Sequence, residues 1–218
     1  MDRPFHDRAD AGQRLAERLR TYAGRSDVIV LGLPRGGAPV AFQVAETLGA
    51  ELDIFLVRKL GVPGHEELAM GAIASGGVVV LNDDVVQCYD IPPDVLDSVI
   101  QAEKQELDRR AAAYRGDRPL PQVRGRTVIL VDDGIATGAS LRAGVEALRQ
   151  MDPARVVVAV PVAARSSCQQ FSQIADEMVC LLTPDPFYAV GLWYEDFSQT
   201  TDEEVRRLLA QARRHPPV

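Results

Sequence analysis

The stretch Val128-Ile-Leu-Val-Asp-Asp-Gly-Ile-Ala-Thr-Gly-Ala-Ser140 decides the fold of this 218-residue chain. Its first four residues are all aliphatic, which predicts a strand covered on both faces and therefore a parallel α/β sheet. Asp132 and Asp133 follow at the carboxyl end of that strand, where ligands bind in open α/β sheets. Two carboxylates there can accept hydrogen bonds from the vicinal hydroxyls of a ribose or help to hold a divalent cation.

The residues after the two acids have the composition of a phosphate-binding turn. Thr137-Gly138-Ala139-Ser140 opens the next predicted helix, where unpaired backbone N–H groups favour an anion and two hydroxyls add donors. The sequence has neither the Gly-Lys-Ser/Thr of a P-loop nor a Gly-x-Gly-x-x-Gly dinucleotide fingerprint. The order of strand, acids and turn therefore indicates a sugar phosphate; the alternative is an ordinary β-α turn with acidic caps.

The segment resembles the signature of the type I phosphoribosyltransferases, which bind 5-phosphoribosyl 1-diphosphate (PRPP). The resemblance implies an α/β fold with a central, mostly parallel sheet flanked by helices, a mobile loop or hairpin, and a small C-terminal hood. It implies that Asp132 and Asp133 meet the ribose 2- and 3-hydroxyls. The residues that it assigns to the 5-phosphate are Gly134, Ile135, Ala136, Thr137, Gly138, Ala139 and Ser140.

A second glycine-rich turn, Gly32-Leu-Pro-Arg-Gly-Gly37, ends the first predicted strand. Its glycines free backbone N–H groups, and Arg35 offers a planar fork of donors for a diphosphate. The turn is similar to the family's pyrophosphate loop, which implies pyrophosphate contacts for Pro34, Arg35, Gly36 and Gly37 and a cis peptide at Pro34-Arg35 or Arg35-Gly36. The alternative is a tight turn with a solvent-facing arginine.

The polar, breaker-rich stretch from Arg58 to Glu67 predicts a mobile loop. Its start, Arg58-Lys-Leu-Gly-Val-Pro-Gly64, resembles the closing loops of adenine, xanthine and orotate phosphoribosyltransferases. Such a loop would bring Arg58 and Lys59 to the diphosphate, stabilise charge on that leaving group and exclude water. The resemblance thus assigns catalytic roles to Arg35, Lys59, Asp132 and Asp133.

The segment Asp185-Pro-Phe-Tyr-Ala-Val-Gly-Leu-Trp-Tyr-Glu-Asp196 resembles the base-binding hood of 6-oxopurine phosphoribosyltransferases. The resemblance implies that Tyr188 stacks on the base, with Phe187 or Trp193 as an alternative ring, although an aromatic cluster near a chain end is also typical of core packing. It also implies Mg²⁺ as cofactor, held mostly through PRPP and water by Asp132, Asp133 and Glu195. Arg165 is the nearest substitute for the family's base-reading lysine, or merely flanks a capping box at Ser166-Ser-Cys-Gln169.

One departure from the family leaves the base unnamed. Ala136 stands where the 6-oxopurine enzymes carry an acidic proton acceptor, so no general base is assigned, and purines are only slightly favoured. Three functions stay open. The first is Mg²⁺-dependent transfer of a phosphoribosyl group from PRPP to a small nitrogenous base. The second is a non-catalytic regulator that senses PRPP or a nucleotide. The third is phosphoryl transfer or hydrolysis, for which no nucleophile stands at a convincing spacing.

Composition bounds the remaining possibilities. A chain that is 46% hydrophobic and 25% charged predicts one domain, residues 1–218. The family resemblance implies that this domain has a core at about 24–184 and a hood at 185–218, with residues 1–23 as a further contribution to the hood. The net charge of −7 argues against a nucleic-acid surface. No apolar run of about 18 residues predicts a membrane span, and the N-terminus lacks a signal core, so we expect a cytoplasmic protein. A homodimer is possible through the long helix 94–114 or the Trp193 region.

Hydrophobic periodicity predicts alternating strands and helices along the chain. Expected strands lie at 28–33, 52–57, 78–81, 128–131, 155–162 and 178–182. Expected helices include one over 11–22, one ended by Gly49 as a C-cap, one over 94–114 opened by Pro92-Pro93, and one opened by Thr201-Asp-Glu-Glu204.

Overall fold

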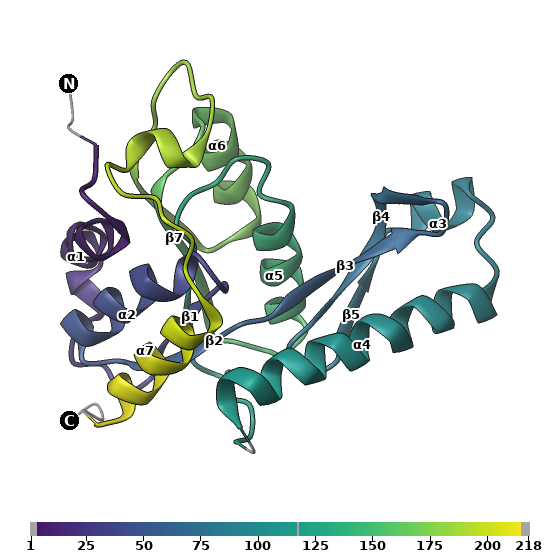
Figure 1. The fold of residues 1–218 in the computed structure, drawn as a ribbon, viewed down its shortest axis with the longest axis horizontal. Helices are drawn as coiled ribbons and strands as arrows, with labels where there is room; N and C mark the ends of the chain where they lie inside the picture. The colour runs from purple at the N-terminus through teal and green to yellow at the C-terminus, as the bar shows by residue number, and fades with distance from the viewer. Residues whose placement is uncertain (1–3, 117, 215–218) are drawn as a thin grey trace.

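A computed structural model describes residues 4–116 and 118–214 of the chain (Figure 1). Five parallel strands form a central sheet in the order β2-β1-β6-β7-β8. Their bounds are Val28–Gly32 for β1, Glu51–Ile54 for β2, Thr127–Val131 for β6, Arg155–Val162 for β7 and Glu177–Leu182 for β8. The predicted α/β class with a parallel sheet is therefore confirmed.

Helices cover both faces of this sheet, which explains why its central strands are aliphatic at every position. Successive residues of β1 alternate between the two layers, because side chains along a strand point to opposite faces. Ile29 packs with the cluster that contains Leu141 of α5 (Ala139–Arg149) and Phe171 of α6 (Arg165–Ile174). Val30 packs instead with the cluster of Leu15 from α1 (Arg8–Arg18) and residues of α2 (Gly37–Leu48).

Several predicted helix ends are present. Gly49 ends α2 in the left-handed conformation (φ 62°, ψ 35°), as a C-cap glycine does. The short 3-10 helix η1, Arg20–Tyr22, extends α1 to the end of the first predicted helix. The Thr201 hydroxyl accepts a 3.1 Å hydrogen bond from the Glu204 backbone N–H at the start of α7 (Asp202–Arg214).

Residues 57–115 form an arm that projects from the core (Figure 1). The arm has an antiparallel sheet in the order β3-β4-β5, with bounds Val57–Val62, His65–Ala74 and Val78–Leu81. The short helix α3 (Asp83–Cys88) leads to the long helix α4 (Pro93–Arg115), which runs back to the core. Leu60, Met70 and Leu107 share one buried cluster between the sheet and α4, and Val205 of α7 joins it.

The structure differs from the prediction in the first part of this arm. The stretch 58–67, predicted from its composition as a mobile loop and from the resemblance as a mobile loop or hairpin, is a β-hairpin made by β3 and the start of β4. The remainder of β4 and α3 were not predicted at all. Leu60 and Val62 are buried, so α4 supplies the covering layer that turns a polar-looking stretch into a strand. The predicted strand 52–57 divides accordingly, because β2 ends at Ile54 and β3 begins at Val57 in the other sheet.

The hood segment lies beside the N-terminal segment. The Phe5 backbone N–H donates to the Trp193 carbonyl (2.7 Å), at the end of the 3-10 helix η2 (Val190–Trp193), and the Glu195 N–H donates to the Phe5 carbonyl (2.8 Å). Residues 1–3 and 215–218 of the predicted single domain lie outside the described residues. The predicted capping box at Ser166 is wrong, because α6 begins at Arg165, its N-cap is Ala164, and that cap makes no side-chain hydrogen bond.

Among the described helices, none combines the length and the apolar character that crossing a membrane requires.

Candidate functional site

A cavity of about 140 Å³ lies where the two glycine-rich turns, the arm and the acidic pair meet. It is lined by Leu33, Pro34, Phe55, Leu56, Val57, Arg58, Leu107, Arg110, Asp132 and Ser140. Four of these residues, Pro34, Arg58, Asp132 and Ser140, were singled out from the sequence. The fold brings them together because β1 and β6 are neighbouring parallel strands, so the turns at their carboxyl ends lie at one edge of the sheet.

The two acids at the end of β6 occupy different surroundings. Asp132 lines the cavity, and its Oδ1 accepts a 2.9 Å hydrogen bond from the Asp133 backbone N–H. Burial raises the pKa of both carboxyl groups, and for Asp132 the neighbouring charge of Asp133 raises the pKa further. Burial disfavours the charged form of a carboxyl group. A bound cation or a set of hydroxyl donors would therefore stabilise the ionised carboxylates of this pair.

Asp133 is held by Arg8 of α1. Arg8 Nε lies 2.8 Å from Asp133 Oδ2, and the guanidinium lowers the pKa of that carboxyl group against the effect of burial. Arg8 also donates to the Ser198 carbonyl (2.7 Å) and lies 3.9 Å from the ring centroid of Phe197. The Tyr194 hydroxyl donates to the Asp133 carbonyl (2.5 Å). The N-terminal helix and the hood are thus both fastened to Asp133, which leaves Asp132 as the acid that faces the cavity.

The glycine-rich turn 32–37, the pyrophosphate-type turn, packs against Asp133. A Cβ added at Gly36 would lie 2.0 Å from Asp133 Oδ2, so only glycine lets the turn approach this closely. The peptide bond between Pro34 and Arg35 is cis, the first of the two positions predicted. Arg35 itself is exposed.

The turn 134–140, the phosphate-type turn, leads into α5, and most of its small residues are exposed to solvent. Ala136, Thr137, Ala139 and Ser140 are exposed, and Gly138 is the N-cap of α5. The first N–H groups of a helix have no partner within that helix, so this end of α5 offers donors and a positive dipole end to an anion. The turn is attached to the end of β7, because the Ile135 N–H donates to the Val162 carbonyl (2.9 Å).

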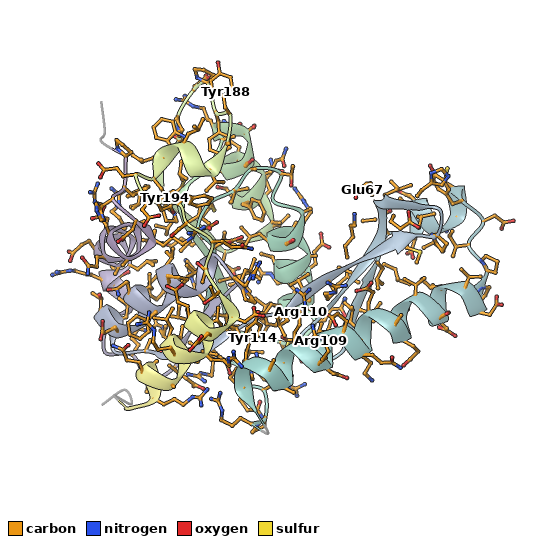
Figure 2. All side chains as sticks on the ribbon, in the orientation of Figure 1. Glu67, Arg109, Arg110, Tyr114, Tyr188 and Tyr194 are labelled. Atoms are coloured by element: carbon orange, nitrogen blue, oxygen red, sulfur yellow. The ribbon has the colours of Figure 1, made fainter. Side chains whose placement is uncertain are left out.

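Lys59 lies elsewhere. Its side chain lines a second, larger cavity of about 590 Å³ between the arm and α5, which meets the smaller cavity at Val57 and Ser140. Its Nζ lies 3.4 Å from Oε2 of Glu67, an exposed residue out on the arm (Figure 2). The structure therefore brings Arg58 to the smaller cavity and Lys59 to the larger one.

The residues predicted to read the base line neither cavity. Tyr188 is 78% exposed at the far end of the hood, and Figure 2 shows it well away from Arg110 at the smaller cavity. Trp193 is half-buried against the cluster that contains Phe5. Glu195 and Arg165 are exposed. The base-binding and metal-binding roles assigned to these four residues stay predictions.

Two arginines at the site, Arg110 and Arg8, were not singled out by the sequence analysis. Arg110 lies on α4 between the buried residues Leu107 and Tyr114, and its position on the apolar face of a predicted helix was the available signal. Arg8 carried no signal, because its partner is 125 residues away in the chain.

Within the described part of the chain, no three His, Cys, Asp or Glu side chains are grouped as a metal site. Asp132 is a carboxylate at the cavity, and oxygen ligands of this kind suit Mg²⁺ when substrate phosphates complete its shell. The donor set therefore fits a magnesium ion that is carried largely by a phosphorylated ligand.

Comparison with known proteins places the chain in a family. The model of the phosphoribosyl transferase domain matches residues 5–192. The chain is 49% identical over 210 residues to the Mycobacterium tuberculosis H37Rv protein named "Putative phosphoribosyl transferase Rv0571c", a match that covers 96% of this chain and 47% of that protein. The chain therefore belongs to the type I phosphoribosyltransferase family, and it spans about half the length of the Mycobacterium tuberculosis relatives it matches.

A solved structure has a similar fold. The structure of the protein TT1426 from Thermus thermophilus is similar with a TM-score of 0.85 and 44% identity, over 95% of this chain and 98% of that one. The similarity therefore extends over nearly the whole of the arm and the core. The family resemblance inferred from the motifs is confirmed by the family model.

Proposed function

We propose that the protein transfers a phosphoribosyl group from PRPP to a nitrogenous base and releases diphosphate. The observation that carries this proposal is the convergence of Pro34, Arg58, Asp132 and Ser140 on one cavity. These residues come from the pyrophosphate-type turn, the arm, the acidic pair and the phosphate-type turn, and each has a part of PRPP that it suits. Family membership supports the same reaction class.

The proposed arrangement of PRPP follows from the donors available. The 5-phosphate would lie on the N–H groups that open α5, with the hydroxyls of Thr137 and Ser140 as added donors. The ribose hydroxyls would donate to Asp132. The diphosphate would lie between the 34–37 turn and Arg58, whose guanidinium is a strong donor to phosphate oxygens.

The reaction breaks the bond between C1 of the ribose and the diphosphate oxygen, and the electron pair leaves with the diphosphate. A base nitrogen then donates an electron pair to C1, and a proton carried by that base passes to water or to the released diphosphate. Arg35 and Arg58 stabilise the charge that develops on the leaving group, because donors aimed at developing charge lower the barrier. Mg²⁺ bound through the phosphates and Asp132 would neutralise part of the same charge. The arm would exclude water from C1 if it closes.

Purines are the first bases to test, because segment 185–196 resembles the hood of purine-directed relatives. Ala136 supplies no acid or base in the phosphate-type turn, so a base that needs little proton transfer is favoured over one that must lose a proton to a side chain.

The test is calorimetric titration of PRPP with Mg²⁺ present, followed by a panel of purine and pyrimidine bases while diphosphate and phosphate release are measured. Binding followed by diphosphate release with one base supports the transferase. Binding without release from any base favours the PRPP-sensing alternative, and release of inorganic phosphate favours a phosphoryl-transfer enzyme. The absence of PRPP binding to the wild-type protein would remove the basis of all three.

A paired comparison ties the binding to the acids. Asp132→Asn combined with Asp133→Asn should abolish Mg²⁺-dependent binding of PRPP, because Asp132, the acceptor of the ribose hydroxyls, loses its charge. Asp94→Asn, on an exposed position in the first turn of α4, removes one negative charge far from the cavity lining and should bind PRPP as the wild type does. Equal binding by the two variants would contradict the assignment of the acidic pair.

A further inference from the structure

One face of α4 is directed at the smaller cavity. Glu103, Leu107, Arg110 and Tyr114 are spaced by four, three and four residues, so they lie on one side of the helix. Leu107 and Arg110 line the cavity, and the Tyr114 hydroxyl bonds to Asp202 of α7. Figure 2 shows Arg110 and Tyr114 on the part of α4 that lies next to the core. The helix is therefore fastened to the core beside the position of Arg110.

The cavity collects positive charge from separate segments of the chain. Arg58 of β3 and Arg110 of α4 both line it, against the single carboxylate of Asp132. Burial and the hydrogen bond to Asp202 raise the pKa of Tyr114 to about 12, whereas the charges of Arg110 and Arg35 act to lower it. A volume of about 140 Å³ is below the roughly 300–1,000 Å³ of pockets for drug-sized ligands, so a small anion suits it better than a whole base.

Each cavity arginine is paired with a carboxylate of α4. Arg58 contacts Glu103 (2.6 Å), and Arg110 Nε contacts Glu106 Oε1 (2.7 Å). Glu106 also accepts two hydrogen bonds from Arg109, at 2.7 and 2.9 Å. The two arginines together lower the pKa of Glu106 to about 2. Because Arg109 stays with Glu106, Arg110 can turn toward an anion without leaving that carboxylate unpaired.

We propose that Arg110 is a diphosphate-binding residue, which exchanges Glu106 for the diphosphate of PRPP or for free inorganic diphosphate in the cavity. This inference rests on the proposed function and adds to it a group that the family motifs do not contain. Arg110 gives hydrogen bonds and no proton, so the C1–O bond still breaks with its electron pair leaving on the diphosphate. Glu106 remains ionised throughout, held by Arg109.

Arg109 provides a matched control for the test. Arg109→Gln and Arg110→Gln each remove one guanidinium from the same carboxylate on the same helix, but only Arg110 lines the cavity. Binding of inorganic diphosphate and of ribose 5-phosphate, each with Mg²⁺, is measured by calorimetry for both variants and the wild type. We expect Arg110→Gln to weaken diphosphate binding by about 10- to 100-fold, the range for losing a hydrogen bond to a charged group.

The same variant should bind ribose 5-phosphate within about twofold of the wild type. Arg109→Gln should also bind ribose 5-phosphate as the wild type does, and should lose less diphosphate affinity than Arg110→Gln, because Glu106 then holds Arg110 more tightly but the guanidinium is still present. Arg110→Lys should recover part of the diphosphate affinity, because it restores the charge without the planar fork. Circular dichroism and urea unfolding establish that each variant is folded; should Arg110→Gln fail to fold, Arg110→Lys and Glu106→Gln replace it. Glu106→Gln frees Arg110 and should bind diphosphate at least as tightly as the wild type.

Two failures can be told apart. Wild-type protein that binds neither diphosphate nor ribose 5-phosphate nor PRPP overturns the proposed function. Wild-type protein that binds PRPP, with equal diphosphate affinity in Arg110→Gln and Arg109→Gln, overturns only the role of Arg110. Loss of ribose 5-phosphate binding together with diphosphate binding in Arg110→Gln would also overturn it, because the defect would then not be confined to the diphosphate.

Discussion

Arg8 and Asp133 are joined by a 2.8 Å contact between Nε and Oδ2, although 125 residues separate them in the chain. The Arg8 and Asp133 side chains are only 12% and 15% exposed. The contact fastens the first helix to the acid that follows β6, and Phe197 covers the guanidinium on the hood side. One ion pair therefore connects the N-terminal segment, the central sheet and the hood at the edge of the candidate site.

Removing Arg8 should cost much of the protein's stability. Arg8→Gln leaves the buried Asp133 carboxylate without its cation, and breaking a buried pair in this way costs about 3–5 kcal/mol. Arg14→Gln is the control, since Arg14 pairs with Asp10 on an exposed helical surface, where such pairs contribute about 0.3–0.5 kcal/mol. Urea unfolding at pH 7 measures both. Equal losses would mean that the Arg8 pair is no more than a surface contact.

Asp132 should oppose folding above its own pKa. Its folded-state pKa is raised above the ordinary 3.8, so the folded protein binds this proton more tightly than the unfolded chain does. Ionisation therefore lowers the stability, and this loss disappears as the pH falls through the raised pKa toward 3.8. Asp132→Asn should be more stable than the wild type at pH 8, by about 1.4 kcal/mol for each unit of the shift, and should approach it near pH 4.

Urea unfolding of the two proteins across that pH range tests the expectation. Asn keeps an oxygen that can accept the Asp133 N–H, so the local hydrogen bond survives the substitution. A stability difference that does not change with pH would show that the charge of Asp132 is not its cause. The same variant should bind Mg²⁺ and PRPP more weakly than the wild type at pH 8, where the wild-type carboxylate is charged, as expected when a functional group is retained at a cost in stability.

The core was predictable because its signals are local. The aliphatic run at 128–131, the C-cap at Gly49 and the acid pair each depend on neighbouring residues, and each has the predicted structure. The hairpin at 58–67 was not predictable in this way. Gly61, Pro63 and Gly64 read as loop residues, and the strand forms because α4, far along the chain, covers Leu60.

The same distinction applies to the candidate site. The turns at the ends of β1 and β6 were found by motif, since the sheet edge they share follows from parallel pairing. Arg8 was not found, because it reaches the site through a tertiary contact that no local pattern encodes. Arg110 was not found either, although its position on the apolar face of a predicted helix was a local signal. Lys59 shows the converse, a motif residue whose strand directs it to the neighbouring cavity.

A methyl group at Gly36 should displace the turn that is proposed to hold diphosphate. In Gly36→Ala the added Cβ would overlap Asp133 Oδ2, which Arg8 holds in place, so the turn must move. We expect PRPP binding to fall at least about tenfold, which corresponds to roughly 1.4 kcal/mol. Calorimetry with PRPP and with ribose 5-phosphate separates the two halves of the ligand. Equal losses for both ligands would indicate a general disruption of the site.

Because Tyr188 is exposed, we predict that it does not stack on the base, the role that the motif assigns to it. Tyr188 is 78% exposed and lines neither cavity, whereas Trp193 is half-buried against the Phe5 cluster. Tyr188→Ala should change the free energy of unfolding by less than about 0.5 kcal/mol, and Trp193→Ala should lower it by about 2 kcal/mol. Once a base is identified, its KM should stay within about twofold in Tyr188→Ala, because nothing in this arrangement brings the ring to C1. A tenfold rise in that KM with unchanged stability would show instead that the hood closes and that Tyr188 then stacks on the base.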